Sequence, residues 1–420
     1  MTVEANRAIK KNLAYTLAMQ GLEYLLPLLI WPYLSRTLGP SELGRTILVL
    51  AICGYLSIIP NWGFSYWGVQ LTVENRNNIA RLSNTFWSIL GARLLLGLTS
   101  FALLLVFAVV FPSEKIGPET LLAIFTVVAS SALSTNWFFQ GIERIEKNAI
   151  FNILAKLVIL IATLNFVTSQ KDSNLVIAIT GVCNCIANTL IIFLCVKSKL
   201  VFPLAGNGAG SLLRIKESSS YFFSSVATTA YTNTNVTLLG LITGNLSAGL
   251  YGGADKIRGA CQNLIVPFSQ VFFPRITLLM GLYPKKALVL AKNLLIFQSC
   301  WTFIASSALF LMSKEIVALI LGQGYQEASL ILKIIAYCPF LIGINTVLGS
   351  HLMLPLGLRT SFNRVLTSTA ILNLIVATPM IFRFQEVGAA ISVLICEVYV
   401  TALMIFCLAS QRAGFFKEHL

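Results

Sequence analysis

A succession of long apolar segments constrains this chain more than any other feature of its sequence. A segment of about 20 apolar residues can cross a bilayer core of about 30 Å as a helix. Twelve such segments are present, at residues 12–35, 43–69, 83–111, 119–140, 149–168, 174–196, 217–241, 246–274, 287–312, 328–353, 361–382 and 387–409. The longest polar gap runs only from Lys197 to Lys216. We therefore expect an all-α integral membrane protein with twelve transmembrane helices and no soluble domain.

The distribution of charge gives these helices an orientation. Only 11% of the residues are charged, against about 25% in soluble proteins. With both termini in the cytoplasm, 19 of the 30 Lys and Arg residues lie in cytoplasmic ends and loops and six lie on the opposite side. This bias follows the positive-inside rule. It accounts for most of the net charge of +14 without nucleic acid as a partner.

Residue types that perform catalysis are sparse in this sequence. All nine cysteines lie in predicted spans, where small buried hydrophobic side chains are the expected role. The two histidines, His351 and His419, are too few for a metal cluster or a Ser–His–Asp set. No glycine-rich phosphate loop is present. We expect a protein that is not an enzyme, with no metal and no organic cofactor.

A repeat of about half the chain is visible in the glycine pattern. Gly39 and Gly44 follow the first span, and an equivalent pair, Gly244 and Gly249, follows the seventh, 205 residues later. The next span in each case contains a proline, Pro60 or Pro267. An even number of spans in each half relates the halves by an axis along the membrane normal. We expect six-helix lobes at 1–200 and 217–420 around a central cavity, joined by a cytoplasmic linker at 201–216.

Eight ionisable residues fall inside the predicted spans. A charge near the bilayer centre costs at least about 2.5–3.5 kcal/mol, so such residues are expected to face protein or water. Two of the eight can reach the interface by extending their side chains. The eight are Glu23, Arg93, Lys156, Asp255, Lys256, Arg258, Lys333 and Glu397.

The stretch "YGGADKIRG" contains three of these charges. Asp255 and Arg258 are three residues apart, so they share a helix face and can pair. Gln262 continues that face, Lys256 points elsewhere, and the preceding span has a polar face that includes Asn235. Two interpretations remain open: a structural pair that joins helices, or a cationic cavity wall on which Asp255 positions Arg258.

A second candidate site lies in the first span. Glu23 precedes Pro27 by four residues, and proline leaves the carbonyl of Glu23 without its helical partner. A carboxyl and a free carbonyl at mid-membrane form a candidate site for H⁺ or Na⁺, although packing of a kinked helix explains the same residues. Glu397 is the second candidate for ion coupling. The hinge candidates are Pro27, Pro60 and Pro267.

Three segments resemble the polysaccharide-flippase branch of the multidrug/oligosaccharidyl-lipid/polysaccharide exporter superfamily. They are "YLSRTLGPSELGR", "NWGFSYWGVQLTVENR" and "LYGGADKIRGACQNLIVPFSQVFFPRI". The resemblance covers the whole chain. It implies a bacterial inner-membrane flippase that moves undecaprenyl-diphosphate-linked oligosaccharide, such as O-antigen repeat units, to the periplasmic leaflet. Membrane lipids surround such a protein, and the polysaccharide polymerase and chain-length proteins of the pathway are candidate partners.

The intramembrane charges agree with an anionic substrate. Five are basic and three are acidic, and the guanidinium fork suits phosphate oxygens. We predict that Arg93, Lys256 and Arg258, with Asp255, Gln262 and Asn235, contact the diphosphate-sugar head. A cation or drug exporter of the same superfamily is one alternative, but it needs an acidic cavity. A membrane-embedded glycosyltransferase or polymerase is the other, and it needs a larger external loop than the roughly 5–15 residues expected here.

Overall fold

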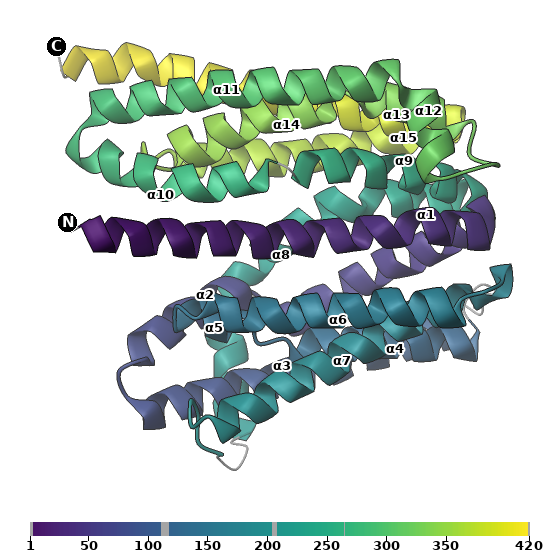
Figure 1. Cartoon of the computed structure of the whole chain (residues 1–420), viewed down its shortest axis with the longest axis horizontal. Coiled ribbons are helices and arrows are strands. Elements are labelled where there is room, and N and C mark those ends of the chain that lie inside the picture. The colour runs from purple at the N-terminus through teal and green to yellow at the C-terminus, as the bar shows by residue number, and fades with distance from the viewer. Residues whose placement is uncertain (1–2, 111–116, 204–207, 264, 419–420) are drawn as a thin grey trace. The chain divides into compact units, whose positions relative to one another are not determined.

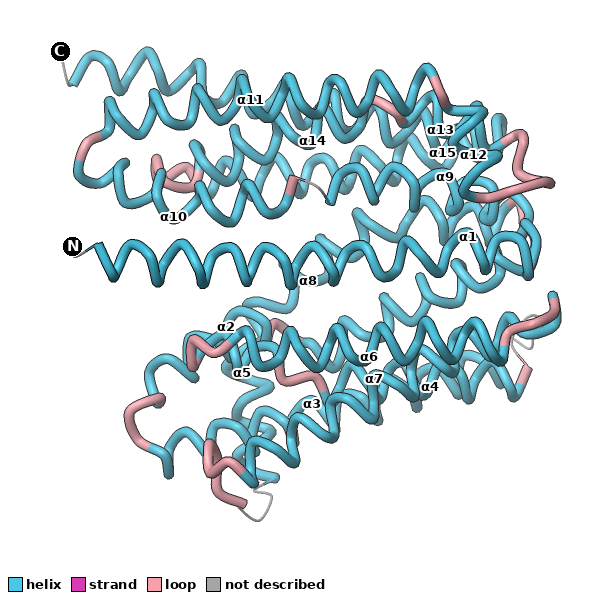
Figure 2. Tube along the Cα trace, in the orientation of Figure 1, coloured by secondary structure: helices cyan, strands magenta, loops and turns pink. Residues whose placement is uncertain are grey.

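The computed structural model is helical throughout the part of the chain that it describes, which is residues 3–110, 117–203, 208–263 and 265–418 (Figures 1 and 2). Side chains are described between residues 29 and 410, apart from some positions that lie mostly at 220–232 and 266–274. The first helices are α1 (Val3–Asn61), α2 (Phe64–Asn75), α3 (Ile79–Val110), α4 (Pro118–Leu133), α5 (Asn136–Gly141), α6 (Ile145–Phe166), the short 3₁₀ turn η1 (Gln170–Asp172), α7 (Ser173–Lys197) and α8 (Gly208–Ile242). The remainder are α9 (Asn245–Asn263), α10 (Val266–Leu282), α11 (Pro284–Leu311), α12 (Ser313–Ile320), α13 (Ala328–Ile335), α14 (Cys338–Thr346), the π-helical stretch η2 (Val347–Met353) and α15 (Arg359–Glu418). The expected all-α fold is confirmed.

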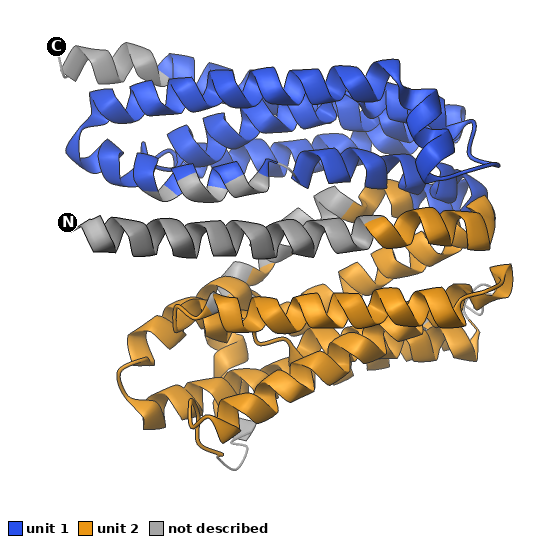
Figure 3. Cartoon of the chain, viewed as in Figure 1, with its two compact units in different colours: residues 1–17, 238–420 blue, residues 18–237 orange. Residues whose placement is uncertain are grey.

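The chain divides into two compact units (Figure 3). The N-terminal unit comprises residues 18–237, and the C-terminal unit comprises residues 1–17 and 238–420. Each boundary therefore falls inside a long helix, one in α1 and the other in α8. These units are defined by how closely their residues pack. The lobes predicted at 1–200 and 217–420 were defined by counting membrane spans instead. Those lobes, and the central cavity, therefore stay predictions. Part of the segment predicted as a linker, from Gly208 onward, is helical.

Eight helical stretches in the described residues are long and apolar enough to cross a bilayer. Two of them, Leu29–Asn75 with 47 residues and Arg359–Ser410 with 52, are about twice the length that one crossing needs. Both contain non-helical backbone, which includes Gly39 (φ 72°) in the first stretch and Gln385 (φ 51°) in the second. Helix α9, which contains the charged residues 255, 256 and 258, is not among the eight. The chain is thus a multi-pass membrane protein, and the count of twelve crossings stays a prediction.

Helix breaks interrupt several of the predicted spans. The span at 43–69 is broken between α1 and α2, where Trp62 (φ 34°) and Gly63 (φ 85°) are both left-handed. Gly63 tolerates this conformation because it has no Cβ. The span at 119–140 is broken between α4 and α5, where Ser134 is extended with ψ 131°. In the C-terminal unit, α9 ends at Asn263 and α10 begins at Val266.

The N-terminal unit is held together by close contact between α4 and α7. A Cβ atom added at Gly181 of α7 would lie 2.1 Å from Oγ1 of Thr126 and 2.6 Å from the backbone nitrogen of Val127 in α4. A glycine at position 181 is therefore required for the backbones of α4 and α7 to pack this closely. A separate aromatic cluster, in which the rings of Phe86 and Phe138 are 4.8 Å apart, packs α3 against α5.

The glycine repeat has a counterpart in the backbone. Gly39 and Gly244 are both left-handed, with φ of 72° and 98°. Helices α3 and α11 begin at Ile79 and Pro284, which are also 205 residues apart. In the C-terminal unit α9, which carries the charged residues 255, 256 and 258, packs against α13, α14 and α15.

Candidate functional site

Arg93 lies in the middle of α3 and contacts both helix breaks of the N-terminal unit, the one after α1 and the one after α4. It is 2% exposed. Its Nε donates to the carbonyl of Ala132 at 3.1 Å, and its Nη2 donates to the carbonyl of Ser131 at 2.6 Å. The same Nη2 donates to Oδ1 of Asn61 at 2.8 Å. Because Asn61 ends α1 and the two carbonyls belong to the last turn of α4, Arg93 satisfies acceptors at both breaks.

The breaks open onto a polar pocket inside the N-terminal unit. Its volume is about 370 Å³, within the range of ligand sites in proteins. Serine and asparagine dominate its lining, which consists of Asn61, Ser65, Arg93, Ser130, Ser131, Ser134, Asn136, Trp137, Asn152, Asn184 and Asn188. Arg93 is the one charged residue of this lining. Helix ends at mid-membrane and unwound backbone are the features from which transporters build binding sites.

The second intramembrane arginine has a different environment in the C-terminal unit. Nε of Arg258 donates to Oδ1 of Asp255 at 2.8 Å, and its Nη1 donates to Oε1 of Gln262 at 2.7 Å. The predicted pairing along one face of α9 is therefore present. The side chains of Arg258 and Asp255 are 15% and 27% exposed, so both are largely buried within this unit.

Glu397 is buried in a polar network of the same unit. Its Oε2 accepts a bond from Nδ2 of Asn345 at 3.1 Å. The hydroxyl of Thr401 lies 2.8 Å from both Oδ1 of Asn345 and the carbonyl of Glu397. Helix α15, which carries Glu397, packs against α9, which carries Asp255 and Arg258, and both helices pack against α14.

The other predicted site residues are placed as follows. Lys256 is exposed, away from the Asp255–Arg258 pair, as the helix geometry predicts. Asn235 is buried, and among the described residues its Oδ1 has no hydrogen-bond partner. Pro60 is buried near the end of α1, two residues before the break at Trp62.

Three predicted site residues cannot be placed in the same way. The side chains of Glu23, Pro27 and Pro267 lie outside the described residues. Their roles as an ion-coupling carboxyl and as hinges stay predictions.

The sequence did not single out several polar residues that the fold brings together. Asn184 and Asn188, one helical turn apart on α7, share the pocket with Arg93, and this spacing was the available signal. Asn345 and Thr401 are the partners of Glu397. Gln298 of α11, 205 residues after Arg93, is buried and donates to the carbonyl of Gly343 at 3.1 Å. Gln298 therefore donates to a backbone carbonyl, as Arg93 does, but carries no charge.

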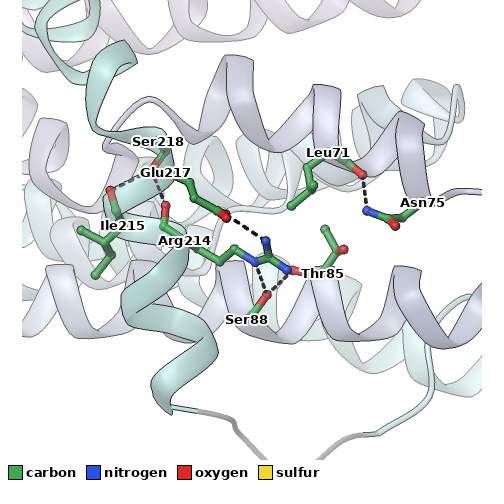
Figure 4. A network of polar contacts seen from close by, with 8 residues as sticks. All are labelled: Leu71, Asn75, Thr85, Ser88, Arg214, Ile215, Glu217 and Ser218. Carbon is green, nitrogen blue, oxygen red and sulfur yellow. Dashed lines mark hydrogen bonds and ion pairs between the residues drawn. The ribbon is translucent and has the colours of Figure 1, made fainter.

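A separate polar network fastens the first part of α8 to α3 (Figure 4). Nε of Arg214 lies 3.3 Å from Oγ of Ser88, and its Nη1 lies 2.9 Å from Oε2 of Glu217. The indole nitrogen of Trp62, at the break after α1, donates to the carbonyl of Ile215 at 3.0 Å. Arg214 thus has a structural role at a distance from the pocket lining.

The family of the chain follows from comparison with known proteins. The model of the family described as "Polysaccharide biosynthesis protein" matches residues 9–280, well over half of the sequence. The chain belongs to this family. It is 28% identical over 409 residues to a protein of Escherichia coli (strain K12) named "Putative O-antigen transporter", covering 96% of this chain and 98% of that one. A protein of Shigella dysenteriae with the same name is also 28% identical, over 94% of this chain and 99% of its own length.

Solved transporter structures share the fold of this family member. The fold matches the lipid II flippase MurJ in an inward closed conformation with a TM-score of 0.76 at 14% identity, over 93% of this chain and 87% of that one. It matches a multidrug resistance MATE transporter of the MOP superfamily with a TM-score of 0.67 at 11% identity, over 95% and 96%. The relatives are named as transporters and flippases. The expectation of a transporter that is not an enzyme is confirmed.

Proposed function

We propose that the protein is a flippase for undecaprenyl-diphosphate-linked oligosaccharide, such as the repeat unit of O-antigen or a similar surface polysaccharide. The observation that supports this most is the near full-length similarity to two proteins named as O-antigen transporters. In this proposal the chain lies in the bacterial inner membrane with both termini in the cytoplasm. The units move by alternating access and expose the glycan to each side in turn.

The basic residues would recognise the anionic head of the substrate. Arg258 is held in a fixed orientation by Asp255 and Gln262, which reduces the entropy lost when it binds phosphate oxygens. Lys256 extends from another face of the same helix, and Arg93 provides the positive charge of the N-terminal unit. The polyprenyl tail would remain in the lipid.

Glu397 would couple transport to an ion gradient. It is a buried carboxyl that accepts a hydrogen bond from a neutral amide, and its helix α15 packs against α9, which carries the Asp255–Arg258 pair. A carboxyl in such a place can exchange a proton or hold Na⁺ with the oxygens of Asn345 and Thr401. Binding there would alter the charge where α15 packs against α9 and α14, which is how ion occupancy would bias the conformation of this unit.

Deletion of the gene tests the transport proposal. Lipid-linked oligosaccharide should accumulate on the cytoplasmic leaflet, where a glycosidase added outside spheroplasts does not reach it. Expression of the wild-type chain should restore external accessibility. Unchanged external exposure in the deletion strain would contradict the proposal.

A cation or drug exporter is the second candidate, because the fold also matches a multidrug transporter. That function requires acidic groups in contact with the cation, whereas the pocket of the N-terminal unit is lined by an arginine and neutral residues. Ethidium efflux by the purified protein in vesicles would favour this alternative over the flippase.

A further inference from the structure

The pocket around Arg93 contains a positive charge with no matching negative one. The lining residues other than Arg93 are neutral. Among the described residues no carboxylate pairs with Arg93, whose hydrogen-bond acceptors are two carbonyls and an amide oxygen. A buried ion without a partner is unstable by several kcal/mol. The site therefore needs another source of negative charge.

The C-terminal end of α4 supplies part of this negative charge. The carbonyls of Ser131 and Ala132 belong to the last turn of α4, and a helix C-terminus is equivalent to roughly half a negative charge. About half of the positive charge of the Arg93 guanidinium is therefore left uncompensated. Within the described part of the chain, Nη1 of Arg93 also has no hydrogen-bond acceptor.

A second donor, on a residue that lines the pocket, lacks an acceptor. The indole nitrogen of Trp137 is buried and has no hydrogen-bond partner among the described residues, and Trp137 is 2% exposed. Buried donors without acceptors cost about 1–3 kcal/mol each. The hydroxyls of Ser65, Ser131 and Ser134 can turn to donate as well. A cation would find no carboxylate here and would be repelled by Arg93.

We infer that this pocket binds a small inorganic anion, of which a halide such as chloride is the simplest. A volume of about 370 Å³ also leaves room for several waters, at about 30 Å³ each, so the anion would be partly hydrated. The inference goes beyond the proposed flippase function, because the anion needs no lipid-linked substrate. The diphosphate of a substrate would compete with it for the same guanidinium.

Bromide titration of the purified full chain in nanodiscs tests the site. Bromide replaces gluconate at constant ionic strength, and tryptophan fluorescence and the apparent Tm are recorded. Bromide quenches indole by contact, so occupancy beside Trp137 should produce a saturable quenching component. The same concentrations should produce a saturable rise in Tm, because an anion that binds only the folded state stabilises it.

The decisive variant is Asn61→Asp. It changes the acceptor 2.8 Å from Nη2 of Arg93 into a carboxylate of the same size, which provides the missing counter-charge within the chain. We expect it to fold and to lose the saturable response. Arg93→Gln should weaken the apparent bromide affinity by about tenfold or more, because a charge-assisted hydrogen bond contributes about 1.5–3 kcal/mol.

The matched control is Arg214→Gln. It removes a partly buried cation from the same unit but not from the pocket, so the saturable response should persist. The inference is overturned if the wild type has no saturable bromide response. It is equally overturned if the response is unchanged in Asn61→Asp, or if Arg214→Gln abolishes it. Since no substrate is present, these results do not depend on the outcome of the flippase tests.

Discussion

The two intramembrane arginines at 93 and 258 differ in what balances their charge. Arg258 has a carboxylate at 2.8 Å on its own helix. Arg93 has backbone carbonyls and an amide oxygen, all of them neutral. A guanidinium paired with a carboxylate attracts an anion less strongly than one bonded to neutral acceptors. At the scale of single residues, we therefore expect Arg93 to attract an anion more strongly than Arg258 does.

A double-mutant cycle distinguishes the two interpretations of the Asp255–Arg258 pair. Arg258→Gln alone leaves a largely buried carboxylate and should lower stability by at most about 3–5 kcal/mol, with less expected because both side chains are partly exposed. Adding Asp255→Asn should recover most of this loss, as measured by thermal unfolding. If the double variant is stable but does not export glycan, the charge itself is required. Full export by the stable double variant would make the pair structural.

Glu397→Gln tests ion coupling. The new amide oxygen can still accept from Asn345, so the apparent free energy of unfolding should change by about 1 kcal/mol or less. The group can no longer titrate, so export should lose its response to an imposed ion gradient. Transport of lipid-linked oligosaccharide into vesicles with and without the gradient provides the measurement. A gradient response equal to that of the wild type would exclude Glu397 as the coupling residue.

The broken helices matter most at the scale of elements. Where α1 ends at Asn61 and α4 ends at Leu133, the regular helical hydrogen bonding of the backbone stops, and polar groups at the helix ends need other partners. Inside a membrane such groups need protein partners or a water-filled cavity. Arg93 supplies the partner and the pocket supplies the cavity. The position of Pro60 beside one break agrees with its predicted place at a hinge, although a hinge motion stays a prediction.

Substitution of Gly181 tests the contact between α4 and α7. Gly181→Ala would place a methyl group against the backbone of α4, so the helices must separate, at a cost of about 1–3 kcal/mol. Gly281→Ala is the matched control, because nothing lies within 4 Å of its added Cβ. Thermal unfolding should show a lower Tm for the first variant and an equal or higher Tm for the second. Equal Tm values for both variants would contradict the contact.

At the scale of the whole molecule, the distribution of basic residues determines orientation. The two compact units each contain helices long enough to cross the membrane. The positive-inside bias predicts that the loop containing Lys171 lies outside and that the turn containing Lys285 lies inside. Net charge does not enter this argument, because only the asymmetry of Lys and Arg between loops decides the orientation.

Cysteine labelling tests this orientation. In a background without cysteines, Lys171→Cys should react with a membrane-impermeant maleimide added to intact spheroplasts. Lys285→Cys should react only after the membrane is permeabilised. Both residues are exposed, so the contrast reports sidedness and not burial. The reverse pattern would place both termini outside the cytoplasm.

The sequence alone was sufficient for the class of the protein. Length and apolarity of the segments require helices in a membrane, because backbone groups in lipid must bond internally. The three-residue spacing of Asp255 and Arg258 was enough to predict their contact, because a helix fixes neighbours three positions apart. The glycine spacing of 205 residues likewise located two equivalent left-handed turns.

Only the tertiary structure decided which residues form the pocket. Asn61, Arg93, Ser131 and Asn188 come from four segments, and their meeting depends on where α1 and α4 break. Hydrophobic pattern does not locate such breaks, because apolar residues continue through them. It also does not reveal that, in the described part of the chain, Arg93 is bonded to neutral acceptors and to no carboxylate. Local spacing decides contacts within one helix, whereas the charge balance of a buried site depends on every helix packed around it.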